Sequence, residues 1–110
     1  YHPSAAHPRA FRRGDVALID LFATSKGGQG MWADQTWMAS IGAPSPRAVA
    51  VWEAVRDARD AAIALLARKL GAGEPARGGE ANDAARAVIV ARGFGPAFTH
   101  RTGHTELQIR

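Results

Sequence analysis

Two apolar segments on either side of a glycine-dense segment constrain the fold of this chain most. Residues 16–23 have the sequence VALIDLFA, and residues 31–42 have the sequence MWADQTWMASIG. Between them lies KGGQG, whose glycine content is typical of a loop tip. Two strand-like segments joined by such a loop predict a β-hairpin. One carboxylate interrupts each apolar segment, Asp20 in the first and Asp34 in the second.

These two carboxylates are the most informative residues of the hairpin. A buried carboxylate without a partner costs several kcal/mol, so each requires one. If the hairpin turns symmetrically about Gly27, Asp20 lies directly opposite Asp34, with the two Cβ atoms about 4.5–5.5 Å apart. Two like charges at that separation repel, and a hard divalent cation between them would reverse the sign of the interaction.

Other interpretations of the same residues stay open. Asp34 would also suit a turn, and a bulge in the hairpin would separate the two carboxylates. A single buried aspartate would also be satisfied by backbone N–H donors. The spacing favours a metal site over these alternatives.

A long helix is predicted after the hairpin. Ser45 is suited to the N-cap position, Pro46 to the first helical position, and the helical period runs from Arg47 to Leu70. Arg56 and Asp60 have the i,i+4 spacing of a surface ion pair. The apolar residues expected on its inward face are Trp52, Val55, Ala62, Ile63, Leu66 and Leu70.

A second helix and a final strand complete the predicted order of elements. Gly71-Ala72-Gly73 ends the first helix, and the second runs roughly from Glu80 to Arg92, with Ala85, Val88 and Ile89 inward. The segment from Pro96 onward is β-like. We therefore expect an α+β fold in which both helices pack on one face of an antiparallel sheet.

Composition excludes several classes of protein. The 110 residues suffice for one small domain, and the absence of cysteine excludes disulfides and thiolate metal sites. No apolar run approaches the roughly 20 residues that span a bilayer, so we expect no membrane segment. The 14 basic residues are scattered among acids, and the net charge is +4, so we expect no nucleic-acid partner. A cysteine-free chain is compatible with a reducing compartment, and we expect a cytoplasmic location.

Near the C-terminus, FTHRTGH contains two of the chain's four histidines, His100 and His104. Neutral imidazole is the commonest metal ligand in proteins. A His-x3-His pair alone is also found capping turns or half-buried in cores, so its interpretation depends on the rest of the chain.

Taken together, RRGDVALIDLFA, ADQTW and FTHRTGH resemble the pita-bread-fold metallopeptidases of family M24, which include aminopeptidase P, prolidase and methionine aminopeptidase. The HRTGH and D-x-T-W forms are most similar to the Xaa-Pro peptidase branch. The resemblance implies a partial pita-bread fold, with Asp20, Asp34 and His104 as metal ligands and His100 beside the substrate. It also implies two divalent metal ions (manganese, cobalt or zinc) and a peptide substrate with proline at its second position. A homodimer is compatible with it.

The sequence departs from the family pattern in several places. The interval between the two aspartates is longer than usual, and Trp37 stands where many relatives have arginine. Thr105-Glu106 replaces the small continuation after the ligand histidine. The family's two glutamate ligands lie further along the chain than residue 110.

We therefore expect residues 1–110 to be a fragment of one catalytic domain, inactive alone. The competing expectation is a non-catalytic pita-bread module that binds peptides or proteins.

Overall fold

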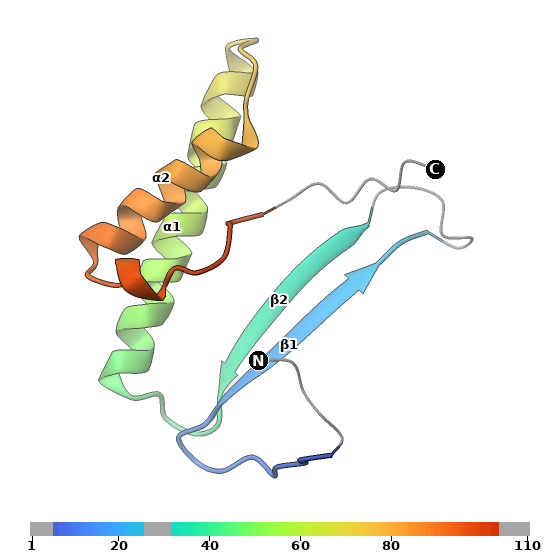
Figure 1. Cartoon of the computed structure of the whole chain (residues 1–110), viewed down its shortest axis with the longest axis vertical. Coiled ribbons are helices and arrows are strands. Elements are labelled where there is room, and N and C mark those ends of the chain that lie inside the picture. Colours follow the sequence, from blue (N-terminus) through green and yellow to red (C-terminus); the bar gives the residue numbers. More distant parts are fainter. Residues whose placement is uncertain (1–5, 26–31, 104–110) are drawn as a thin grey trace. The chain divides into compact units, whose positions relative to one another are not determined.

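The computed structural model describes residues 6–25 and 32–103, and Figure 1 shows its elements. Their order is β1 (Val16–Ala23), β2 (Ala33–Ser40), α1 (Pro46–Gly71), α2 (Gly78–Ala91) and the short 3₁₀ helix η1 (Gly95–Ala97). The chain divides into two compact units, one with the hairpin and one, Pro46–Glu106, with the helices. The order of hairpin and two helices confirms the α+β prediction. The packing of the helices on the sheet stays a prediction.

β1 and β2 form an antiparallel two-stranded sheet, as the apolar segments predicted. The predicted register, however, is wrong. Asp20 pairs with Thr36, and Asp34 pairs with Phe22, so the carboxylates are not directly opposite each other. The symmetric turn about Gly27 was an assumption, and the register of a hairpin depends on turn geometry that composition does not specify. The error amounts to two residues in pairing, an even number, so the face of each side chain is unchanged.

The turn before β1 fixes where the hairpin begins. The Arg12 N–H donates to the Asp15 carboxylate at 2.8 Å, and the Asp15 N–H donates to the Arg12 carbonyl at 3.0 Å. Gly14 has φ +92°, which a residue with a side chain rarely adopts. Hydrogen bonds from Arg9 and from the Arg12 backbone lower the pKa of Asp15. Asp15 therefore has the turn role that its position after Gly14 suggests.

Both helices end in the same way. Gly73 and Gly93 have positive φ, +71° and +80°, and each lies two residues past its helix. After α1, the Glu74 N–H donates to the Lys69 carbonyl at 2.8 Å, and the Gly73 N–H donates to the Leu70 carbonyl at 3.0 Å. This is a Schellman motif, which satisfies carbonyls that would otherwise lack partners at the helix end. The glycine stop predicted for α1 is confirmed, and α2 ends with the same motif at Gly93.

The core of the helical unit is a seam of small residues between α1 and α2. Ile89 is the largest side chain in it, and five alanines make up the rest. Small residues on both helices allow the backbones to approach closely. The inward face predicted for α2 is largely confirmed, but much of the face predicted for α1 is wrong. Buried are Ala54, Ala58, Ala62, Ala81, Ala85 and Ile89, whereas Trp52, Val55, Ile63 and Leu70 are more than half exposed.

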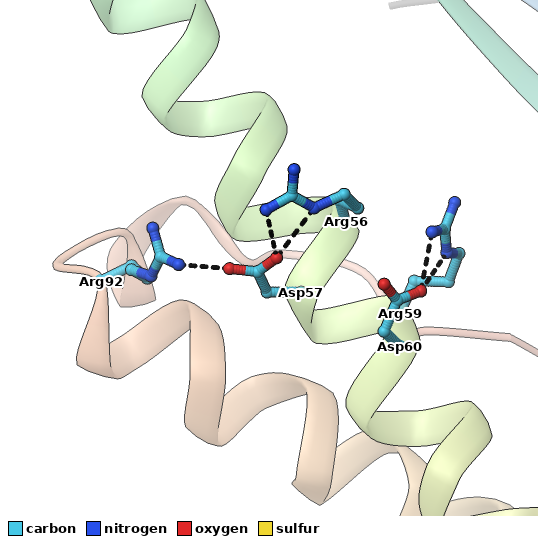
Figure 2. A network of polar contacts seen from close by, with 5 residues as sticks. All are labelled: Arg56, Asp57, Arg59, Asp60 and Arg92. Atoms are coloured by element: carbon cyan, nitrogen blue, oxygen red, sulfur yellow. Dashed lines mark hydrogen bonds and ion pairs between the residues drawn. The ribbon is translucent and has the colours of Figure 1, made fainter.

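An ion pair joins the middle of α1 to the end of α2, and two further pairs lie along α1 (Figure 2). The Asp57 carboxylate accepts hydrogen bonds from Arg56, at 2.7 and 2.9 Å, and from Arg92 of the segment that follows α2. The Arg56 hydrogen bond is the main cause that lowers the pKa of Asp57. The predicted Arg56–Asp60 pair is wrong, because Asp60 pairs with its neighbour Arg59 at 2.7 Å.

A second link joins the end of α1 to the start of α2. Lys69 Nζ donates to both carboxylate oxygens of Glu80, at 2.6 and 2.8 Å. The backbone N–H of Arg77, the N-cap residue of α2, donates to the same carboxylate at 2.9 Å. The Lys69 hydrogen bond is the main cause that lowers the pKa of Glu80. One carboxylate thus caps α2 and anchors it to α1.

The segment after α2 is not the strand that the sequence predicted, as far as the structure describes it. Residues 95–97 form η1, and residues 98–103 belong to no strand. Pro96 cannot donate a ladder hydrogen bond, and Gly95 weakens a strand further. Residues 104–110 lie outside the described part of the chain. None of the helices among the described residues has both the length and the hydropathy that a bilayer-spanning helix requires.

Candidate metal centre

The hairpin places Asp20 and Asp34 on the same face of the sheet. Asp20 is paired with Thr36, and Asp34 lies two residues before Thr36 on β2, so the carboxylates are diagonal neighbours. Diagonal residues of an antiparallel pair are about 7–8 Å apart, and their Cβ atoms are somewhat closer. Both residues are exposed.

Thr36 contributes directly to this face. Its Oγ1 donates a hydrogen bond to Asp20 Oδ1 at 2.9 Å. The bond fixes the orientation of the Asp20 carboxylate and engages Oδ1, while Oδ2 is a second oxygen on the same group. Thr36 is the threonine of the D-x-T-W form, and the sequence alone assigned it no contact. The D-x-T spacing of Asp34 and Thr36 carried the signal, because residues i and i+2 of a strand share a face.

The donor set of this face fits a hard divalent cation in type. Carboxylate oxygens are the preferred ligands of such ions. Ligating carboxylates are usually held in place by a hydrogen bond from a neighbouring group, as Thr36 holds Asp20. Two carboxylates are not a complete site. Across residues 6–25 and 32–103, no group of three or more His, Cys, Asp or Glu side chains gathers as a metal site would require. His104, the third predicted ligand, lies outside these residues.

His100, the predicted substrate-side residue, lies in the segment between η1 and residue 103 and is exposed. Two side chains of α2 contact this segment. Asn82 Oδ1 accepts hydrogen bonds from the Thr102 N–H at 3.1 Å and from Thr102 Oγ1 at 3.3 Å. Arg86 donates to the Phe98 carbonyl at 3.3 Å, and its guanidinium lies 4.3 Å from the centroid of the Phe98 ring.

Sequence reasoning missed Asn82 and Arg86. Both are polar residues on an amphipathic helix, where such residues ordinarily face solvent. Their i,i+4 spacing was available in the sequence, but only the fold brings the Phe98–Thr102 segment against them.

The sequence profile of metallopeptidase family M24 matches residues 1–106 of the chain. The chain belongs to metallopeptidase family M24. The M24 assignment agrees with the resemblance carried by the two aspartate segments and FTHRTGH. No curated protein gives a significant match.

Two solved structures show the M24 fold in this chain. A prolidase from Thermococcus sibiricus is 31% identical, with a TM-score of 0.71, and the match covers 94% of this chain and 25% of the prolidase. The dipeptidase PepE from Mycobacterium ulcerans is 30% identical, with a TM-score of 0.69, and the match covers 87% of this chain and 24% of the dipeptidase. The chain thus spans about a quarter of the length of each structure, and its partial pita-bread fold is confirmed.

Proposed function

We propose that this chain is the part of an M24 catalytic domain that supplies two aspartate ligands to a dinuclear metal centre, and that the domain hydrolyses peptides at Xaa-Pro. The observation that supports the proposal most is the common face of Asp20 and Asp34, with Asp20 oriented by Thr36. The family match and the two similar peptidases support the reaction class.

Each residue has a distinct role in this proposal. Asp20 and Asp34 hold the metal ions, and His104 ligates one of them. His100 donates a hydrogen bond to the substrate carbonyl or to the tetrahedral intermediate. When bound, divalent ions would supply a water of lowered pKa and a polarised scissile carbonyl. Thr36 keeps the Asp20 carboxylate in one orientation, so that less conformational entropy is lost when a cation binds.

The 110 residues alone are expected to bind a cation weakly and not to hydrolyse peptides. Asp20 and Asp34 offer two negative charges against the four positive charges of two divalent ions. The glutamate ligands implied by the family resemblance are not among residues 1–110. A group that accepts the proton of the attacking water is also required.

The test is hydrolysis of an Xaa-Pro dipeptide with added manganese or cobalt, by this chain and by any longer chain encoded in the same reading frame. We expect metal-dependent turnover only by the longer chain, and none by its Asp20→Asn variant. The matched control is Asp83→Asn, the same change at an exposed position of α2. An Xaa-Ala dipeptide with the same first residue tests the preference for proline.

Two outcomes would contradict the proposal in different ways. Turnover by the 110 residues alone would show that the glutamate ligands implied by the family resemblance are not needed. A longer chain that binds manganese and peptide but does not cleave would favour the non-catalytic pita-bread module instead.

A further inference from the structure

Two side chains of α2 fix the segment that contains His100 at both of its ends. Asn82 accepts two hydrogen bonds from Thr102, and Arg86 both donates to the Phe98 carbonyl and lies against the Phe98 ring. Asn82 and Arg86 are four residues apart, so they lie on the same face of α2, one turn from each other. His100 is midway between the two fixed points.

This arrangement matters because residues 98–103 have no strand or helix ladder in the described part of the chain. A segment without such a ladder depends on side-chain contacts to lose its conformational freedom. The two attachments differ in kind: one is a pair of hydrogen bonds to the Asn82 amide oxygen, and the other combines a hydrogen bond with a cation–π contact. Together they define where the backbone enters and leaves the bend at His100.

We propose that Asn82 and Arg86 are positioning residues that hold the segment Phe98–Thr102, which we call the histidine segment, on α2. The inference rests on the proposed function in one respect: it assigns the held segment to the metal centre. His100 lies within it, and His104 follows Thr102 by two residues. Asn82 and Arg86 then act on metal affinity through the backbone of the histidine segment.

The first measurement needs neither metal nor activity. Amide hydrogen exchange is followed at Thr102 in the 110-residue chain and in Asn82→Leu and Asn82→Asp variants. Leucine has a similar size but no acceptor, whereas aspartate keeps an oxygen for both Thr102 donors. We expect exchange at Thr102 about two- to tenfold faster in Asn82→Leu, the range for loss of one hydrogen bond, and unchanged in Asn82→Asp. Equal helix content by circular dichroism shows that α2 itself is intact.

The second measurement is cobalt binding to the same chains, with His104→Ala and Arg86→Met added to the set. Loss of groups that orient a ligand typically lowers metal affinity about 10- to 100-fold. We expect weaker cobalt binding in Asn82→Leu, Arg86→Met and His104→Ala, with recovery in Asn82→Asp.

The outcomes separate this inference from the proposed function. If His104→Ala weakens cobalt binding but Asn82→Leu and Arg86→Met do not, the positioning role is wrong and the ligand assignment stands. If cobalt binding is unaffected by His104→Ala, the ligand assignment is wrong, and exchange at Thr102 still decides whether Asn82 holds the segment. Equal exchange at Thr102 in wild type and Asn82→Leu would overturn the inference.

Discussion

Replacement of Asp20 by asparagine tests the metal centre through the sign of its effect on stability. In the metal-free hairpin, Asp20 and Asp34 are like charges on one face, at diagonal positions. At about 7 Å in water, two unit charges repel by roughly 0.6 kcal/mol, and salt reduces this further. Asparagine removes the charge but keeps an oxygen that can accept the Thr36 hydroxyl. Asp20→Asn should therefore raise the stability of the metal-free hairpin by roughly 0.3–0.6 kcal/mol or leave it unchanged.

A bound cation should reverse this sign. A ligand that binds only the folded state stabilises it by RT ln(1 + [L]/Kd), about 1.4 kcal/mol at a concentration ten times Kd. Wild type should gain this stabilisation with manganese, and Asp20→Asn should lose most of it. The assay is hydrogen exchange at the amides of β1 and β2, with chelator and with manganese. A local probe is needed because two compact units need not unfold together.

Asp83→Asn is the control, since it makes the same change at an exposed residue of α2, and manganese should stabilise the hairpin in this variant as much as in wild type. Two results would refute the reasoning. A loss of more than about 2 kcal/mol in Asp20→Asn with chelator would mean that the carboxylate is a structural hydrogen-bond acceptor. Equal stabilisation of wild type and Asp20→Asn by manganese would mean that the cation binds elsewhere.

Two further predictions concern the helical unit. Ile89→Ala should lower the free energy of unfolding by about 2–4 kcal/mol, because Ile89 is 5% exposed, whereas Ile63→Ala, at a residue 56% exposed, should lower it by less than about 1 kcal/mol. The measurement is urea unfolding followed by circular dichroism at 222 nm. Equal losses in the two variants would mean that the alanine seam is not the main core. The hydrogen bond from Lys69 lowers the pKa of Glu80, so the ionised Glu80 side chain stabilises the folded state. This stabilisation is present above the unfolded pKa of about 4.3 and is lost as the pH falls through the lower folded pKa. Thermal unfolding between pH 6 and pH 3 should therefore depend less on pH in Glu80→Gln, and an identical profile in the variant would contradict this.

The strands and helices could be predicted from local signals, but their pairing could not. The apolar runs and the glycines that flank them predicted the ends of β1 and β2 to within about two residues, and the predicted start of α1 at Pro46 agrees with the structure. The register of the hairpin depends on how the chain turns between the strands, and KGGQG is compatible with several turns. The shared face of Asp20 and Asp34 was nevertheless predicted correctly, because a register change of an even number of residues preserves the face.

The buried face of α1 was mispredicted for a physical reason. Large apolar residues were taken as the core stripe, yet Ala54, Ala58 and Ala62 form the contact with α2. Alanine is the best helix former and loses no side-chain entropy, so its position in a sequence says little about burial. Small residues determine the packing here only because α2 presents small residues in return. That match between two helices is a property of the fold, and neither segment displays it alone.

The contacts that orient the candidate site were hidden from sequence reasoning in the same way. Alternation along β2 alone puts Thr36 on the same face as Asp34. The hydrogen bond from Thr36 to Asp20, however, requires the observed register. Asn82 and Thr102 are separated by 20 residues, and their contact exists only because α2 ends at Ala91 and the chain returns along the helix after Gly93. The two candidate aspartate ligands are thus visible in the sequence, because each is a charged residue within an apolar run. The groups that hold them are ordinary polar residues, and only the three-dimensional arrangement gives them a role.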